Sequence, residues 1–145
     1  MNELRQRLEK TLYTLKHRKA FREIEKKYFG YVSFRGYIHD IDKVFLYILI
    51  GIEATTRFHR KFAKHHENSA RTYQDFKEMA IDWECARYTK EDKPLNAYDT
   101  LYLYYPYFEL KILPILKAMG VAYSIKNEIV GKKNSTKIKL VFKGE

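Results

Sequence analysis

The chain has 145 residues, of which 46% are hydrophobic and 16% aromatic, with a single cysteine and a formal net charge of +10 at pH 7. This length allows one domain with one hydrophobic core, and the hydrophobic fraction excludes extensive disorder. The lone Cys85 excludes an internal disulfide, the longest apolar run (residues 44–52) is too short to span a bilayer, and the charged start MNELRQRLEK has no signal-peptide core. We therefore expect a soluble cytoplasmic protein that is not associated with a membrane.

The positive charge is unevenly distributed. Its whole excess lies in residues 1–36 and 119–145, while residues 37–118 carry balanced charge. Such basic ends would attract phosphate-bearing partners, from nucleotides to nucleic acid. Dispersed lysines that simply keep a small protein soluble explain the same pattern, and both interpretations stay open.

The hydrophobic periodicity predicts an all-α fold, a helical bundle that ends in a β-hairpin or tail. Gly30 should end the first helix, and Gly51 either joins or separates the second and third. Pro106 and Pro114 should divide the last helical region into two or three pieces. The predicted helices cover residues 2–28, 39–50, 52–67, 72–89 and 97–119, with a turn at 31–36.

The last part of the chain has a different pattern from the rest. Apolar residues alternate at Ile138, Leu140 and Phe142 beside a Gly-Lys-Lys-Asn-Ser turn, which is typical of a hairpin or of a loosely attached tail. We expect a helical domain over residues 1–119, and a basic C-terminal hairpin or extension of the same domain over residues 120–145.

Histidines recur on the inner faces of the predicted helices. His17 lies four residues after Tyr13 on the inward face of its helix, and His59 and His66 are seven residues apart and share a face. On a continuous helix, His65 would point about 100° away from His66. We expect all five histidines of the chain to gather in one region.

Carboxylates and a lysine accompany these histidines. The stretch HDIDK places Lys43 three residues after Asp40 and four after His39, so its ammonium group can reach the same site. Glu78 and Asp82 are four residues apart and present two carboxylates on one side of a helix.

Imidazole and carboxylate ligands suit Mn, Fe, Co, Ni or Zn, and the lack of cysteine ligands argues against a closed structural zinc site. One bound ion can activate water, and two can also clamp a phosphate ester. Simpler interpretations stay open: Asp40 or Asp42 can cap a helix with Lys43 in solvent, and a lone inward histidine such as His17 is commonly a hydrogen-bonded core residue.

Three motifs, HDIDK, FHRKFAKHH and EMAIDW, occur in this order over residues 39–83, within a resemblance that covers roughly residues 10–119. Their sequence resembles the HD superfamily of metal-dependent phosphohydrolases, and is most similar to a group of small bacterial and phage HD-like proteins whose role is not assigned. The resemblance implies a bacterial or phage protein with an HD-domain-like helical bundle. It also implies hydrolysis of a nucleotide or related phosphate ester, as a phosphomonoesterase or phosphodiesterase with one or two divalent transition-metal ions.

The resemblance also implies roles for individual residues. Asp40 would orient the attacking water, and Lys43 would contact the substrate phosphate, as could Arg60. His59 and His66 would lie near a second metal or near the substrate phosphate. The implied metal ligands are His17, His39, Asp40 and Asp82.

Two other functions remain open. The chain can be a non-catalytic HD-like module that binds a nucleotide or nucleic acid through its basic ends. It can also be a phage-type interaction or inhibitor protein that uses its aromatic surface and its C-terminal segment. The sequence does not indicate an oligomeric state.

Overall fold

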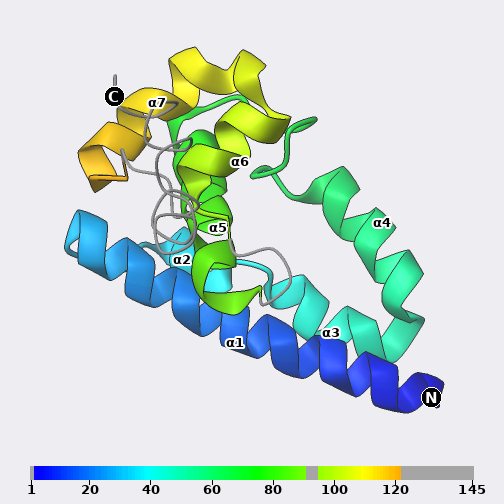
Figure 1. The fold of residues 1–145 in the computed structure, drawn as a ribbon. Helices are drawn as coiled ribbons and strands as arrows, with labels where there is room; N and C mark the ends of the chain where they lie inside the picture. Colours follow the sequence, from blue (N-terminus) through cyan, green and yellow to red (C-terminus); the bar gives the residue numbers. More distant parts are fainter. Residues whose placement is uncertain (1, 91–94, 122–145) are drawn as a thin grey trace, which may run out of the picture. The chain divides into compact units, whose positions relative to one another are not determined.

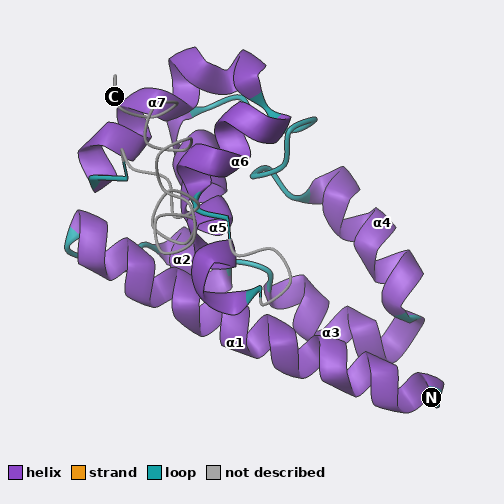
Figure 2. Cartoon of the chain, in the orientation of Figure 1, coloured by secondary structure: helices purple, strands orange, loops and turns teal. Residues whose placement is uncertain are grey.

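The computed structural model describes residues 2–90 and 95–121. All regular secondary structure in these two ranges is helical, and Figure 2 shows no strand in them, which confirms the predicted all-α class. The predicted C-terminal hairpin, at residues 122–145, lies outside the described residues. The chain divides into two compact units, residues 1–78 and 79–145.

The first unit is built on the long helix α1 (Glu3–Phe29), which begins and ends close to the predicted bounds. The Asn2 side chain caps its start by accepting from the backbone N–H of Arg5, and Gly30 ends it with a φ of 83°. Helix α3 (Ile41–Ile50) packs along α1 (Figure 1), and Arg7 of α1 donates to the carbonyl of Ile48 at 2.8 Å.

A short helix, α2 (Phe34–Ile38), replaces the turn that was predicted before residue 39. Ser33 caps it by accepting from the backbone N–H of Gly36. The backbone N–H and the hydroxyl of Ser33 in turn donate to the buried carboxylate of Glu25, at 2.9 and 2.7 Å. These contacts fix α2 against α1, and so fix the start of the turn that carries His39 and Asp40.

Helix α4 (Ile52–Phe62) is a separate helix, because Gly51 adopts φ 92° and ψ 172°, a conformation open essentially only to glycine. The sequence left this point undecided. The predicted end of the third helix at residue 67 was wrong: α4 ends at Phe62, and His65 and His66 lie in the following turns. Helix α5 (Tyr73–Thr89) begins in the first unit and continues into the second.

The second unit contains the rest of α5, then α6 (Ala97–Tyr104), the 3₁₀ helix η1 (Pro106–Phe108) and α7 (Glu109–Met119). The predicted break occurs at Pro106, whereas Pro114 lies inside α7 and does not end it. Asn96 caps α6 by accepting from Asp99, and the core of this unit includes Leu101, Ile112, Leu116 and Met119.

Among the described residues, no helix combines the length and the apolar character that crossing a membrane requires.

Candidate metal centre

The centre begins at the sharp turn between α2 and α3. Asp40 has φ 54° and ψ 19°, and it is the only non-glycine residue with a positive φ in residues 2–90 and 95–121. Aspartate tolerates this left-handed conformation better than most residues. Arg18 of α1 holds the turn by donating to the carbonyls of His39 and Tyr37, at 2.9 and 2.6 Å. The His39 and Asp40 side chains are consequently buried, with 1% and 5% of each residue exposed.

All five histidines gather here, as the sequence predicted. The ring centroid of His39 lies 5.3 Å from that of His17 and 4.6 Å from that of His65. The His59 centroid lies 5.1 Å from that of His65 and 4.9 Å from that of His66. Every one of these histidines belongs to the first unit.

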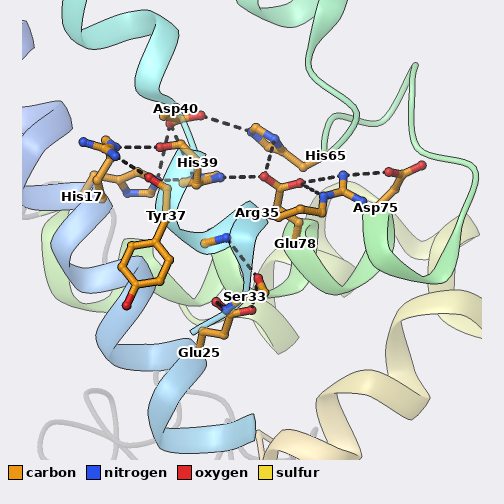
Figure 3. Close-up of polar contacts among 12 residues, drawn as sticks. His17, Glu25, Ser33, Arg35, Tyr37, His39, Asp40, His65, Asp75 and Glu78 are labelled. Atoms are coloured by element: carbon orange, nitrogen blue, oxygen red, sulfur yellow. Dashed lines mark hydrogen bonds and ion pairs between the residues drawn. The ribbon is translucent and has the colours of Figure 1, made fainter. Parts of the chain in front are cut away.

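The two carboxylate oxygens of Asp40 face different histidines. Oδ1 lies 3.0 Å from Nε2 of His59 and 3.4 Å from Nε2 of His65. Oδ2 lies 3.6 Å from Nε2 of His39 and 3.7 Å from Nε2 of His17, and it accepts from Lys43 at 3.1 Å. Asp40 therefore stands between two pairs of imidazole nitrogens (Figure 3 shows His17, His39 and His65).

Two further carboxylates hold the far sides of the rings. Glu78 Oε1 lies 3.0 Å from Nδ1 of His39 and 3.4 Å from Nδ1 of His65, and Asp42 Oδ2 lies 2.8 Å from Nδ1 of His59. Because an ionised carboxylate only accepts hydrogen bonds, Nδ1 of His39 and of His59 carries the proton. Without a metal ion, Nε2–H of His59 donates to Asp40 Oδ1. A ring that binds a metal ion must give up that proton, and its lone pair then lies on Nε2, the nitrogen that faces Asp40.

This donor set fits a metal ion. Ligand atoms that share an ion at about 2.0–2.2 Å lie roughly 3–3.5 Å from one another in a tetrahedral site, which is close to the separations around Asp40. Carboxylates on the far nitrogens are a common feature of histidine–metal sites. Within the first unit, His59, His65 and His66 form one group of potential ligands, and His39, His65 and Glu78 form another. These buried groups can hold a metal ion.

Hydrogen bonds keep the buried carboxylates ionised. Burial raises the pKa of Asp40, but the charge on His39 and the hydrogen bonds from His59 and His65 outweigh it and hold that pKa well below its ordinary value. Burial likewise raises the pKa of Glu78, and hydrogen bonds from His39 and His65 lower it to about 2.

Arg35 connects the centre to the start of α5. Its guanidinium donates to Glu78 at 2.8 and 3.1 Å and to Asp75 at 2.8 Å (Figure 3). Burial lowers the pKa of Arg35, but the hydrogen bonds and charges of these two carboxylates raise it overall. Asp75 also accepts from the backbone N–H groups of Arg71 and Thr72, so it fixes the first turn of α5 as well.

The structure corrects the helix-cap interpretation. Asp40 occupies the N-cap position of α3 but makes no side-chain cap hydrogen bond, and Asp42 binds His59 instead of lying free in solvent. The sequence predicted that His66, and not His65, would lie on the same helix face as His59. Because α4 ends at Phe62, that helical spacing does not apply, and His65 lies close to Asp40.

The remaining predicted residues have different surroundings. The exposed Arg60 extends to Glu67 at 3.3 Å. Asp82 lies on α5 one helical turn after Glu78, in the second unit, and its assignment as a metal ligand stays a prediction. The phosphate-binding roles of Lys43, His59, Arg60 and His66 also stay predictions.

Sequence reasoning assigned no role in the site to His65, Asp42, Glu78 or Arg35. Two sequence features could have indicated these roles. Glu78 lies four residues before Asp82, and His65 belongs to the HH pair. Asp42 and Arg35 gave no local signal, because their partners lie 17 and about 40 residues away along the chain.

A cavity of about 300 Å³ opens beside the centre, within the first unit. Its polar lining comes from the histidines and carboxylates described above together with Arg35. Its apolar lining comes from Ile38, Phe58, Phe62 and Ala63.

Comparison of the chain with protein-family models, with curated proteins and with solved structures finds no match.

Proposed function

We propose that this chain is a metal-dependent phosphohydrolase of HD type that acts on a nucleotide or a related phosphate ester. The observation that carries the proposal is the environment of Asp40, whose two oxygens face separate pairs of imidazole Nε2 atoms. Such a set of imidazole and carboxylate donors would suit divalent metal ions. The HDIDK motif at this turn adds support through its resemblance to the HD superfamily.

The proposed metal is a divalent transition ion, Mn, Fe, Co, Ni or Zn, because the donors are imidazole nitrogens and carboxylate oxygens. When bound, such an ion supplies a Lewis acid that lowers the pKa of water and stabilises negative charge on a phosphate. His17, His39, Asp40 and Asp82 would hold one ion. His59, His65 and His66 would hold a second.

The protein residues have distinct tasks in this proposal. Asp40 holds the attacking water by accepting its hydrogen bond, and its low pKa keeps it able to accept. Lys43 would stabilise a phosphate oxygen with its positive charge, and its ammonium group 3.1 Å from Asp40 Oδ2 supports this role. Glu78 and Asp42 orient the rings of His39 and His59.

The test is metal analysis of the purified protein, followed by hydrolysis assays on a nucleotide panel with added Mn²⁺, Co²⁺ or Ni²⁺. We expect bound metal and phosphate release. Asp40→Ala should abolish both, while Glu53→Gln, which removes an exposed carboxylate from α4, should abolish neither. A protein that binds no metal and hydrolyses none of the nucleotides would overturn the proposal.

The charge distribution favours a second candidate, a binding module without chemistry. The excess basic residues lie at the ends of the chain and not in its middle. This candidate predicts nucleotide or nucleic-acid binding that weakens steeply with salt. It also predicts that Asp40→Ala leaves that binding unchanged, which separates it from the phosphohydrolase.

A further inference from the structure

The cavity beside the candidate centre has two unlike walls. One wall consists of the histidines and carboxylates around Asp40, and the other contains Phe58 and Phe62 of α4. The two phenylalanines are four residues apart, so they lie on one face of the helix, and their ring centroids are 4.8 Å apart. His59, next to Phe58, reaches Asp40 from the same helix.

Core packing does not account for this aromatic wall. Phe58 is 44% exposed and Phe62 is 58% exposed, whereas the core aromatic Phe21 is 1% exposed. The burial of apolar area that normally justifies a phenylalanine is thus largely missing at these two positions. Their rings are instead available to a molecule that enters the cavity.

The dimensions and charge of the cavity restrict that molecule. A volume of about 300 Å³ is at the lower end of the range for ligand pockets, so it suits one small molecule and not a nucleic-acid strand. Arg35 is the one lysine or arginine among the described residues that line the cavity, and Asp75 and Glu78 already engage its charge. Apart from the proposed metal ions, the lining thus supplies little positive charge for further phosphate groups, which favours a single phosphate at the centre.

We propose, on the basis of the phosphohydrolase function above, that Phe58 and Phe62 bind the base of a nucleoside monophosphate whose phosphate lies at the histidine centre. Stacking on an aromatic ring suits every base, because every base has a π face. The described lining includes no Asn, Gln, Ser or Thr side chain that would distinguish the edges of different bases. The site therefore prefers nucleotides over sugar phosphates, but selects little between purines and pyrimidines.

The test compares Phe58→Leu, Phe62→Leu and the double variant with the wild-type protein. Leucine keeps an apolar side chain and removes the aromatic face. The matched control is Phe45→Leu, which changes a phenylalanine of α3 that is 61% exposed. Calorimetry measures the binding of four nucleoside monophosphates, of ribose 5-phosphate and of an unphosphorylated nucleoside, and circular dichroism checks that each variant is folded.

We expect the double variant to bind all four nucleoside monophosphates about tenfold more weakly, or worse, with little change for ribose 5-phosphate. Phe45→Leu should match the wild type. If the wild type binds ribose 5-phosphate as tightly as the nucleotides and hydrolyses both, the aromatic-wall inference is wrong while the phosphohydrolase proposal stands.

If instead the protein binds no metal and hydrolyses no substrate, binding of the unphosphorylated nucleoside still tests whether Phe58 and Phe62 bind a base. Nucleoside binding that is lost in the double variant supports the inference without the enzyme. A wild-type protein that binds neither nucleoside nor nucleotide overturns it.

Discussion

At the scale of single residues, the candidate centre depends on which nitrogen of each ring is turned toward Asp40. Glu78 and Asp42 decide this for His39 and His59, because each accepts from Nδ1 and leaves Nε2 directed at the shared carboxylate. A stacked contact adds to this restraint, since the ring of the buried Phe21 lies 3.9 Å from that of His39, centroid to centroid, with 18° between the planes. For metal binding at the candidate centre, the residues that orient the histidine rings are therefore as important as the histidines themselves.

This leads to a prediction for Glu78→Gln and Asp42→Asn. Each amide keeps the shape of the side chain but can present an N–H group to Nδ1, so it no longer enforces the tautomer in which Nε2 is the nitrogen that would bind metal. We expect metal affinity to fall about 10- to 100-fold in each variant, as is typical when such outer partners are changed. Competition with a chromophoric chelator measures this loss.

Glu53→Gln serves as the control, because it makes the same chemical change at an exposed position on α4. Unchanged metal affinity in both Glu78→Gln and Asp42→Asn would contradict the role assigned to these carboxylates.

At the scale of the elements, the short helix α2 positions the turn that bears His39 and Asp40. The carboxylate of Glu25 is 2% exposed, accepts twice from Ser33 and lies 3.4 Å from the ammonium group of the buried Lys77. Lys77 also lies over the ring of Phe29, 4.2 Å from its centroid. This buried polar group joins α1, α2 and the start of α5, so the turn has little freedom to move.

Gly36 in α2 lies close to this group, and Gly36→Ala should be strongly destabilising. A Cβ atom at this position would lie 2.1 Å from Glu25 Oε1, and that carboxylate is held by Ser33 and Lys77 and cannot easily shift. We expect a loss of about 1–3 kcal/mol in the free energy of unfolding, measured by urea denaturation. The double variant Gly36→Ala with Glu25→Ala should lose less stability than the sum of the two single losses, because the clash with the Glu25 carboxylate is absent. A Gly36→Ala protein as stable as the wild type would be inconsistent with this packing.

The long helix was predictable from sequence, because its signals are local. Leucines and aromatics recur along α1 at helical spacing, and Gly30 lies at its end with the positive φ that glycine favours. The same holds for the break at Pro106. The gathering of the five histidines was predicted from the inward faces of helices, and this reasoning holds for His17 and His59, whereas His39, His65 and His66 reach the site from turns.

The rest of the centre depended on contacts that local patterns do not contain. The polar segment after Phe62 continued a helical pattern, so the sequence did not show that α4 ends there and that His65 turns inward. The partnership of Asp42 with His59 requires the angle that Gly51 sets between α3 and α4. The sequence does not specify that angle, because glycine accepts many backbone conformations.

At the scale of the whole molecule, the stability of the fold depends on buried carboxylates that remain ionised. In spite of burial, hydrogen bonds from His39 and His65 hold the pKa of Glu78 at about 2. The charge on His39, with hydrogen bonds from other histidines, holds the pKa of Asp40 well below its ordinary value. In the unfolded chain both groups would return to pKa values near 4. Below about pH 5 the unfolded state therefore binds more protons than the folded state, and stability falls as pH falls.

We accordingly predict that the metal-free protein loses stability steadily between about pH 5 and pH 2. Each such carboxylate contributes a slope of up to about 1.4 kcal/mol per pH unit in this window, and little above it. Urea denaturation at a series of pH values, with chelator present, measures the slope. Glu78→Gln should be less stable at neutral pH but should show a shallower decline in acid, because one of the titrating groups has been removed. A variant with the same slope as the wild type would show that Glu78 does not titrate differently in the folded and unfolded states, and would remove the electrostatic basis for the centre described above.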